Sequence, residues 1–375
     1  MKVKILNEEP YGDLICSHML QEFPSVSIMN DCELVEALSR LIVGTKEVRY
    51  GCLPSPEALV VLRKTIRNAI ESNVPIPILV PWGSIKANFS ASIDIAEVSA
   101  IQRVITLSHQ IKEYYSVGAE VVIRVEDTSG YTLFTLEGDQ EMIKANIDSY
   151  SRDMVTLVKT LDPSNVVRVQ LESEMKHAEN FNDSFNFIQP LIQQYLNDSS
   201  TLIQFAPDKV EELSSFQKLK ELGWRGVISL EQRSHYMSAY SKLYSDWNES
   251  QLIKRLSLYF AGAWARHTLQ MTGKQSYWNN GFIQLAFIPP IKGLPEGYNY
   301  NYVYYRTLPL SEARTHISPW RAKGYFKING NELQYKLTSF NDIELIAQLT
   351  PVKLVITNEE KNTIVIISTD YLLES

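Results

Sequence analysis

The chain has 375 residues, 45% of them apolar, and a formal net charge of -7. This length and composition allow a sizeable core in one or two domains. An acidic balance without a run of Lys or Arg excludes the usual electrostatic footprint of a nucleic-acid-binding protein. No apolar segment approaches the length that crosses a bilayer. The cysteines, Cys16, Cys32 and Cys52, fit neither a disulfide framework nor a zinc site, and residues 1–5 do not resemble a signal peptide. We therefore expect a soluble cytoplasmic protein that acts on small molecules.

Residues 1–74 are predicted to form a helical N-terminal region. Ser55 offers a capping hydroxyl, Pro56 suits the first helical position, and Glu57 lies near the positive end of the helix dipole. The apolar residues that follow recur at helical spacing, so a helix is expected from Pro56 onward.

Residues 75–275 alternate between predicted strands and long helices. The apolar runs predict strands at 76–80, 121–125 and 166–171. The helical patterns cover 94–115, 140–161, 185–196 and much of 207–272. This alternation predicts an α/β fold: a Rossmann-like, mostly parallel sheet flanked by helices. Residues 81–86 are expected to form a turn after the first strand.

Residues 276–375 are rich in short strand patterns. They lie at 282–288, 300–306, 324–328, 333–337, 352–357 and 363–368. Asn329, Gly330 and Asn331 favour a hairpin turn, as do residues 358–362. The prediction is a mostly antiparallel, β-rich C-terminal part that extends or caps the parallel sheet.

Common cofactor and metal motifs are absent from the sequence. There is no GxGxxG, GxxxxGK[ST], HExxH, CxxC or GxSxG, and the six histidines are scattered. We therefore expect neither a bound cofactor nor a metal ion.

Two stretches place chemically useful residues just after predicted strands. Trp82 and Lys86 follow the first strand, and Asp94 and Glu97 open the next helix. A lysine there can hold a phosphate or move protons, although a solvated loop lysine beside an acidic helix cap fits equally. Asp127, with Gly130, follows the second strand and suits a ligand-facing loop, or ordinary turn chemistry.

Two later stretches gather basic and aromatic side chains. Arg233 and Tyr236 share one face of a predicted helix and can hold a carboxylate or phosphate, or form a surface Arg above a core Tyr. His316, Trp320 and Arg321 lie between two predicted strands. That grouping suits an anionic metabolite, and a solvated connection is the alternative.

Taken in order, these stretches resemble the isonitrile (isocyanide) synthase family, which is grouped with pyoverdine and dityrosine biosynthesis proteins. The resemblance covers roughly residues 75–340. It rests on Leu79 to Lys86 with Asp94 and Glu97, on Asp127 with Gly130 and Phe134, on Arg233 with Tyr236, on Gly281 to Pro289, and on Ser318 to Arg321. The chain departs from the family where Gln284 and Ile288 stand in place of an Arg and a His. It also has Arg321 in place of a His and Ala87 in place of a Ser.

The resemblance implies a cofactor-free transferase or lyase of secondary metabolism. The α-amine of an amino acid would condense with the ketone of ribulose 5-phosphate, and fragmentation would leave the carbonyl carbon on nitrogen as an isonitrile. Lys86 would shuttle protons or bind phosphate, and Asp127 or Glu97 would be the base. The substrate-binding residues would be Trp82, Arg233, Tyr236, His316, Trp320 and Arg321.

The missing histidines leave two other functions open, because histidine is a common proton-transfer group. One is a different transferase or lyase on the same scaffold, acting on an amine and a sugar phosphate or formyl donor. The other is a non-catalytic binding protein. The oligomeric state does not follow from the sequence.

Overall fold

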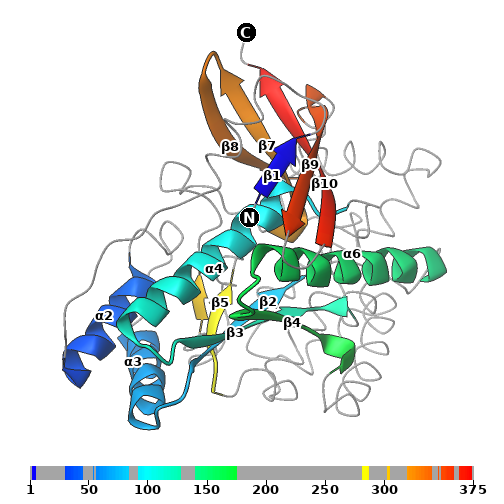
Figure 1. The fold of residues 1–375 in the computed structure, drawn as a ribbon. Coiled ribbons are helices and arrows are strands. Elements are labelled where there is room, and N and C mark those ends of the chain that lie inside the picture. The colour runs from blue at the N-terminus through cyan, green and yellow to red at the C-terminus, as the bar shows by residue number, and fades with distance from the viewer. Residues whose placement is uncertain are drawn as a thin grey trace, which may run out of the picture.

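The computed structural model contains two five-stranded sheets with helices between them (Figure 1). It describes residues 2–5, 30–44, 54, 56–83, 92–127, 140–174, 281–286, 302–304, 319–339, 345, 348–358 and 363–373. The helices expected at 185–196 and within 207–272 lie outside these ranges.

The first sheet is entirely parallel, and this confirms the predicted α/β class. Its strand order is β4-β3-β2-β5-β6. The strands are β2 (Ile76–Trp82), β3 (Ala119–Val125), β4 (Val167–Leu171), β5 (Ile283–Ala286) and β6 (Tyr302–Tyr304). The first three are joined through α4 (Ile95–Tyr114) and α6 (Gln140–Leu161). This is the predicted β-α-β-α-β alternation.

Strand β2 is longer than the sequence indicated. Pro81 and Trp82 were expected in a turn, but both belong to the strand and pair with β3. The Glu126 N–H donates to the Trp82 carbonyl at 2.8 Å, which holds the end of the strand to the chain after β3. A turn was expected because Pro81 has no N–H to donate to a neighbouring strand. The structure keeps the extended backbone instead, because it buries the apolar side chain of Trp82.

One face of the parallel sheet packs on α4 and α6, and the second sheet packs on the other side of these helices (Figure 1). Alternation along the strands points Ile78, Val80 and Ile123 toward the helices, and all three are buried. Helix α4 carries buried residues on most of its surface because it is covered by both sheets.

The N-terminal region is helical over α2 (Asp31–Val43) and α3 (Pro56–Glu71). Helix α3 begins at Pro56, as predicted. Helix α2 begins with a capping box in which Asn30 and Glu33 exchange side-chain to backbone hydrogen bonds at 3.0 Å.

Strand β1 (Lys2–Ile5) corrects the purely helical expectation for residues 1–74. It pairs antiparallel with β9 at the edge of the second sheet. A four-residue strand whose partner lies at the other end of the chain leaves little local signal, so the sequence pattern did not reveal it.

Strands β5 and β6 also differ from the expectation. The sequence placed both in the antiparallel C-terminal part, whereas they extend the parallel sheet on the far side of β2. The chain therefore adds β3 and β4 on one side of β2 and β5 on the other. The strand order reverses between β2 and β5, the position where open α/β sheets bind their ligands.

The second sheet has the order β1-β9-β10-β7-β8. Its C-terminal strands are β7 (Ala322–Asn329), β8 (Glu332–Ser339), β9 (Thr350–Asn358) and β10 (Thr363–Leu373). The β7–β8 hairpin turns at Gly330, which has a φ of 58°. The sheet is mostly antiparallel, as predicted, and mixed because β10 pairs parallel with β7.

No helix in the described part of the chain is both long enough and apolar enough to span a membrane.

Candidate active site at the carboxyl edge of the parallel sheet

The candidate site lies where β2 and β3 end. The two strands are in register there, with Trp82 opposite Val125. The chain after β2 leads into the Lys86 stretch, and the chain after β3 reaches Asp127. Ligands of open α/β sheets bind outside this carboxyl edge.

A buried chain of hydrogen bonds links the end of β2 to both helices. Trp82 Nε1 donates to the Tyr150 hydroxyl at 3.0 Å, and this hydroxyl donates to Glu97 Oε1 at 2.9 Å. Glu97 is 0% exposed, and its other carboxylate oxygen accepts from Asp94 N at 2.9 Å. We call these four residues, from β2, α6 and α4, the polar chain.

The polar chain continues into the second sheet at Gly324. Asp94 Oδ1 accepts hydrogen bonds from Ala96 N at 2.8 Å and from Gly324 N at 3.3 Å. A Cβ on Gly324 would lie 2.5 Å from Ile95 Cγ2 and 2.6 Å from Ala96 N. Only glycine lets β7 approach the first turn of α4 this closely. Asp94 thus both caps α4 and ties it to the C-terminal sheet.

Trp320 brings the fourth sequence stretch to the same place. It lies in the short 3-10 turn η6 (Pro319–Arg321), and its ring centroid is 5.2 Å from that of Trp82. The planes are tilted by 50°, an arrangement that aromatic pairs favour. A Cβ on Gly83 would lie 2.5 Å from Trp320 Nε1, so the residue after β2 must be small for the rings to meet.

Two phenols with buried hydroxyls, those of Tyr150 and Tyr335, lie beside the acids of the polar chain and remain protonated at neutral pH. Burial raises the pKa of Tyr150 well above 10, and the Glu97 carboxylate raises it further. Burial also raises the pKa of Tyr335, on β8, and the Asp94 and Glu97 carboxylates act in the same direction. The Tyr150 hydroxyl therefore remains a hydrogen-bond donor to Glu97.

Asp127 lies on a more open part of the edge. It is half-buried, and its Oδ1 accepts from Ser173 N at 3.0 Å, while its Oδ2 accepts from the Ser173 hydroxyl. Ser173 belongs to η2 (Glu172–Glu174), which follows β4. These bonds hold the Asp127 carboxylate in one orientation near the strand ends, where a ligand can reach it.

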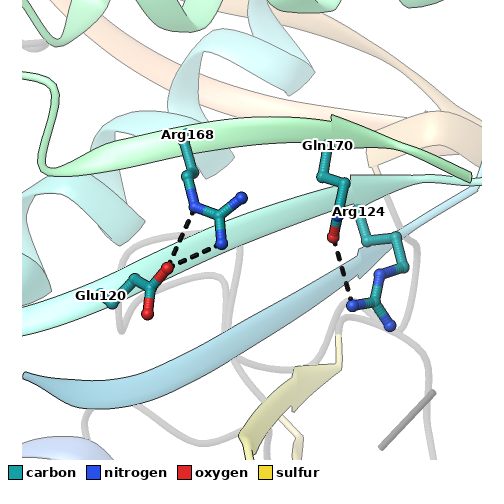
Figure 2. A network of polar contacts seen from close by, with 4 residues as sticks. All are labelled: Glu120, Arg124, Arg168 and Gln170. Carbon is teal, nitrogen blue, oxygen red and sulfur yellow. Dashed lines mark hydrogen bonds and ion pairs between the residues drawn. The ribbon is translucent and has the colours of Figure 1, made fainter. Parts of the chain in front are cut away.

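The opposite face of the parallel sheet carries polar residues (Figure 2). Arg124 Nη2 donates to Gln170 Oε1 at 3.3 Å, and Arg168 Nη2 forms an ion pair with Glu120 Oε1 at 2.7 Å. The Arg168–Glu120 pair is exposed, so solvent screens it and it stabilises the fold little. Arg124, in contrast, is only 7% exposed.

The structure brings together part of the predicted site. Trp82 and Trp320 touch each other, Glu97 lies behind them in the polar chain, and Asp127 lies at the neighbouring strand end. For Arg321 only the position in η6 is described. Outside the described ranges are Lys86, Arg233, Tyr236 and His316.

Sequence reasoning missed Tyr150, Arg124 and Tyr335. Tyr150 is one of 20 tyrosines and lies at an ordinary apolar position of its helix. Arg124 did leave a signal, because a charged residue inside the buried run 121–125 is unusual. Within the described ranges, no three His, Cys, Asp or Glu side chains lie close enough to hold a metal ion.

Comparisons with known proteins gave matches among solved structures alone. No family model and no curated protein matches the chain. The chain is similar to the PvcA protein from Pseudomonas aeruginosa, with 14% identity over 90% of this chain and 99% of that one, and a TM-score of 0.48. The tyrosyl-tRNA synthetase from Aeropyrum pernix has 12% identity over 68% of this chain and 52% of its own, with a TM-score of 0.26.

The tyrosyl-tRNA synthetase from Pyrococcus horikoshii, complexed with L-tyrosine, has 13% identity over 66% of this chain and 53% of its own, with a TM-score of 0.25. This chain spans about half the length of each synthetase. With identities of 14% or less and TM-scores below 0.5, none of these likenesses assigns the chain to a family.

Proposed function

We propose that this protein is an enzyme resembling the isonitrile synthases. It converts the α-amine of an amino acid to an isonitrile, with ribulose 5-phosphate as the carbon donor. The amine condenses with the sugar ketone and releases water, and proton transfers and fragmentation then leave the former carbonyl carbon on nitrogen.

One observation carries this proposal: three of the five stretches that resemble the family meet at one edge of the parallel sheet. Trp320 packs on Trp82 at 5.2 Å, although the two residues lie far apart in the sequence. Glu126 N, beside Asp127, donates to the Trp82 carbonyl. Parallel pairing of β2 and β3 brings the first two of these stretches together in any sheet of this kind. The contact of Trp320 does not follow from that pairing, so it is the part that favours an active site over a non-catalytic scaffold.

The surroundings of Asp127 and Glu97 suggest different roles for these two catalytic candidates, and the role of Lys86 is proposed from its place after β2. Asp127 is half-buried at the edge and is the base that removes protons during enolisation. Lys86, in the stretch after β2, binds the phosphate or returns a proton. Glu97 is fully buried and holds Tyr150 and Asp94, so it acts by positioning Trp82 rather than by touching the substrate.

The substrate-binding residues are proposed from the resemblance, and the structure describes the side chains of two of them, Trp82 and Trp320. Trp82 and Trp320 are 0% and 3% exposed and pack on each other at the strand end, so their role is to form the buried back of the amino-acid slot. Arg233 and Arg321 bind the anionic groups through guanidinium. Tyr236 and His316 complete the amino-acid side of the site.

The test is direct incubation of the purified protein with L-tyrosine or L-tryptophan and ribulose 5-phosphate, followed by mass spectrometry. The expected product is the amino acid with one carbon gained and two hydrogens lost. A product of different composition from the same substrates would favour another transferase or lyase. No product and no thermal stabilisation by either substrate would favour a non-catalytic protein and overturn the proposal.

A further inference from the structure

The starting observation is a buried amide on β5. Gln284 is 0% exposed, and neither its Nε2 nor its Oε1 has a hydrogen-bond partner in the described structure. A buried amide without partners is costly, so the position is expected to serve a ligand or to be replaced by an apolar residue. Strand β5 is the strand across the reversal from β2, and Gln284 lies opposite Leu79, within the strand pair that borders the ligand-binding position of the sheet.

The strand registers place Gln284 on the same face as Arg124. Gln284 is opposite Leu79 on β2, and Pro81, two residues further along β2, is opposite Arg124 on β3. Since side chains alternate along a strand, all four residues point to one face of the sheet. Leu79 is only 2% exposed, so this face is covered like the one that packs on α4 and α6.

Arg124 and Gln284 flank β2 on that face. With strands about 4.8 Å apart and a rise of about 3.3 Å per residue, their Cα atoms are separated by about 12 Å. Leu79 and Pro81 form an apolar floor between them. Within the described part of the chain Gln284 has no hydrogen-bond partner, so the two side chains do not bond each other across this distance.

The chemistry of the two side chains defines the ligand. Arg124 is always charged and pairs well with carboxylate or phosphate oxygens. The Gln284 amide can donate through Nε2 and accept through Oε1. Together they match an anionic oxygen group with a hydroxyl or amine beside it. An α-amino acid carries this pair in its carboxylate and amine, and a sugar phosphate carries it in its phosphate and hydroxyls.

We infer that Arg124 and Gln284 bind the anionic end of a substrate on the second face of the parallel sheet, with Gln284 fixing the group next to the charge. This inference rests on the proposed function and deepens it, because it assigns a binding role to Arg124 and to Gln284, neither of which was among the predicted site residues.

The experiment replaces Gln284 by Met, which keeps the unbranched length and removes both polar atoms. Isothermal titration calorimetry then measures the binding of L-tyrosine, tyramine, ribulose 5-phosphate and ribulose. Tyramine lacks the carboxylate and ribulose lacks the phosphate, so the two pairs of probes distinguish the two sources of the anion. Gln334→Met, on an exposed position of β8, is the matched control.

The expected result is a loss of affinity of about tenfold or more for L-tyrosine alone or for ribulose 5-phosphate alone. The matching probe without the anion should already bind at least about tenfold more weakly to the wild-type protein, because Arg124 then has no anion to bind. The ligand-free variant should also melt at a temperature equal to or about 2 °C above that of the wild type, because an amide without partners has been removed. The Gln334 control should change neither quantity.

Two outcomes would overturn the inference: unchanged affinity for both anionic probes, or a large drop in melting temperature without ligand. The second would mean that Gln284 supports the fold. Should Met disturb packing, Gln284→Leu and Arg124→Lys test the same contacts. Isonitrile formation by Gln284→Met at the wild-type kcat/KM would refute this inference while leaving the proposed function intact. If Gln284→Met weakens substrate binding but the wild-type protein forms no isonitrile, this inference stands and the proposed function is refuted.

Discussion

Tyr150 on α6 donates a hydrogen bond of 2.9 Å to Glu97 on α4 while it accepts one from the indole of Trp82. The end of β2, which leads into the Lys86 stretch, is therefore fixed by the two helices that follow it in the chain. An active site at this edge needs such support, because groups that contact the substrate act only when they are held in place.

The Tyr150→Phe variant should be less stable than the wild type by about 2 kcal/mol. The substitution keeps the ring but takes one buried hydrogen-bond partner from both Trp82 and Glu97. Urea denaturation followed by circular dichroism measures the difference. Tyr114→Phe, on the partly buried side of α4, is the control and should stay within about 0.5 kcal/mol of the wild type. Equal stability of the two variants would refute the polar chain.

The same hydroxyl predicts a pH dependence. The pKa of Tyr150 is raised in the folded protein, whereas an unfolded tyrosine ionises near pH 10. The protonated Tyr150 hydroxyl therefore stabilises the folded state fully below about pH 10, and this stabilisation is lost as the pH rises toward the pKa of Tyr150 in the folded protein. The free energy of unfolding should fall more steeply between about pH 9.5 and 11 in the wild type than in Tyr150→Phe. The same slope of the free energy of unfolding against pH in both proteins would contradict this prediction.

The Lys86→Ala variant should lose at least about 100-fold in kcat/KM, because a phosphate ligand or proton shuttle is removed. Its melting temperature should match that of the wild type. Lys144→Ala, at an exposed position of α6, provides the control and should retain full activity. Wild-type turnover by Lys86→Ala would rule out a catalytic role for this lysine.

The Asp127→Asn variant should lower kcat by about 100- to 10,000-fold, since an amide cannot accept the substrate proton. The amide oxygen introduced by this substitution can still accept one hydrogen bond from Ser173, so the fold should persist, as a thermal melt would show. Asp148→Asn, on the exposed side of α6, should leave kcat unchanged. A loss of less than about tenfold at Asp127 would mean that another group is the base.

Local signals in the sequence predicted much of the fold. The helix expected at 140–161 has those bounds in the structure, and α3 begins at the predicted Pro56. Periodicity and capping residues are local properties, so they can be recognised without the rest of the chain. The hairpin at Gly330 was found for the same reason.

Features that depend on distant partners were missed. Strands β5 and β6 look like any short strand, and nothing in their residues shows that they extend the parallel sheet on the far side of β2. The Trp82–Trp320 contact and the Asp94–Gly324 hydrogen bond likewise join segments from opposite ends of the sequence. Single residues such as Tyr150 gain their roles from those contacts, so sequence patterns could not single them out.

The most direct test of the central claim follows one carbon atom. Ribulose 5-phosphate labelled with 13C at its ketone carbon is incubated with the protein and L-tyrosine, and the product is analysed by NMR and mass spectrometry. The account predicts that the label appears as the isonitrile carbon bonded to the amino-acid nitrogen, and that Lys86→Ala and Asp127→Asn form little of it. A wild-type protein that binds both substrates yet transfers no labelled carbon to nitrogen would contradict the proposed reaction.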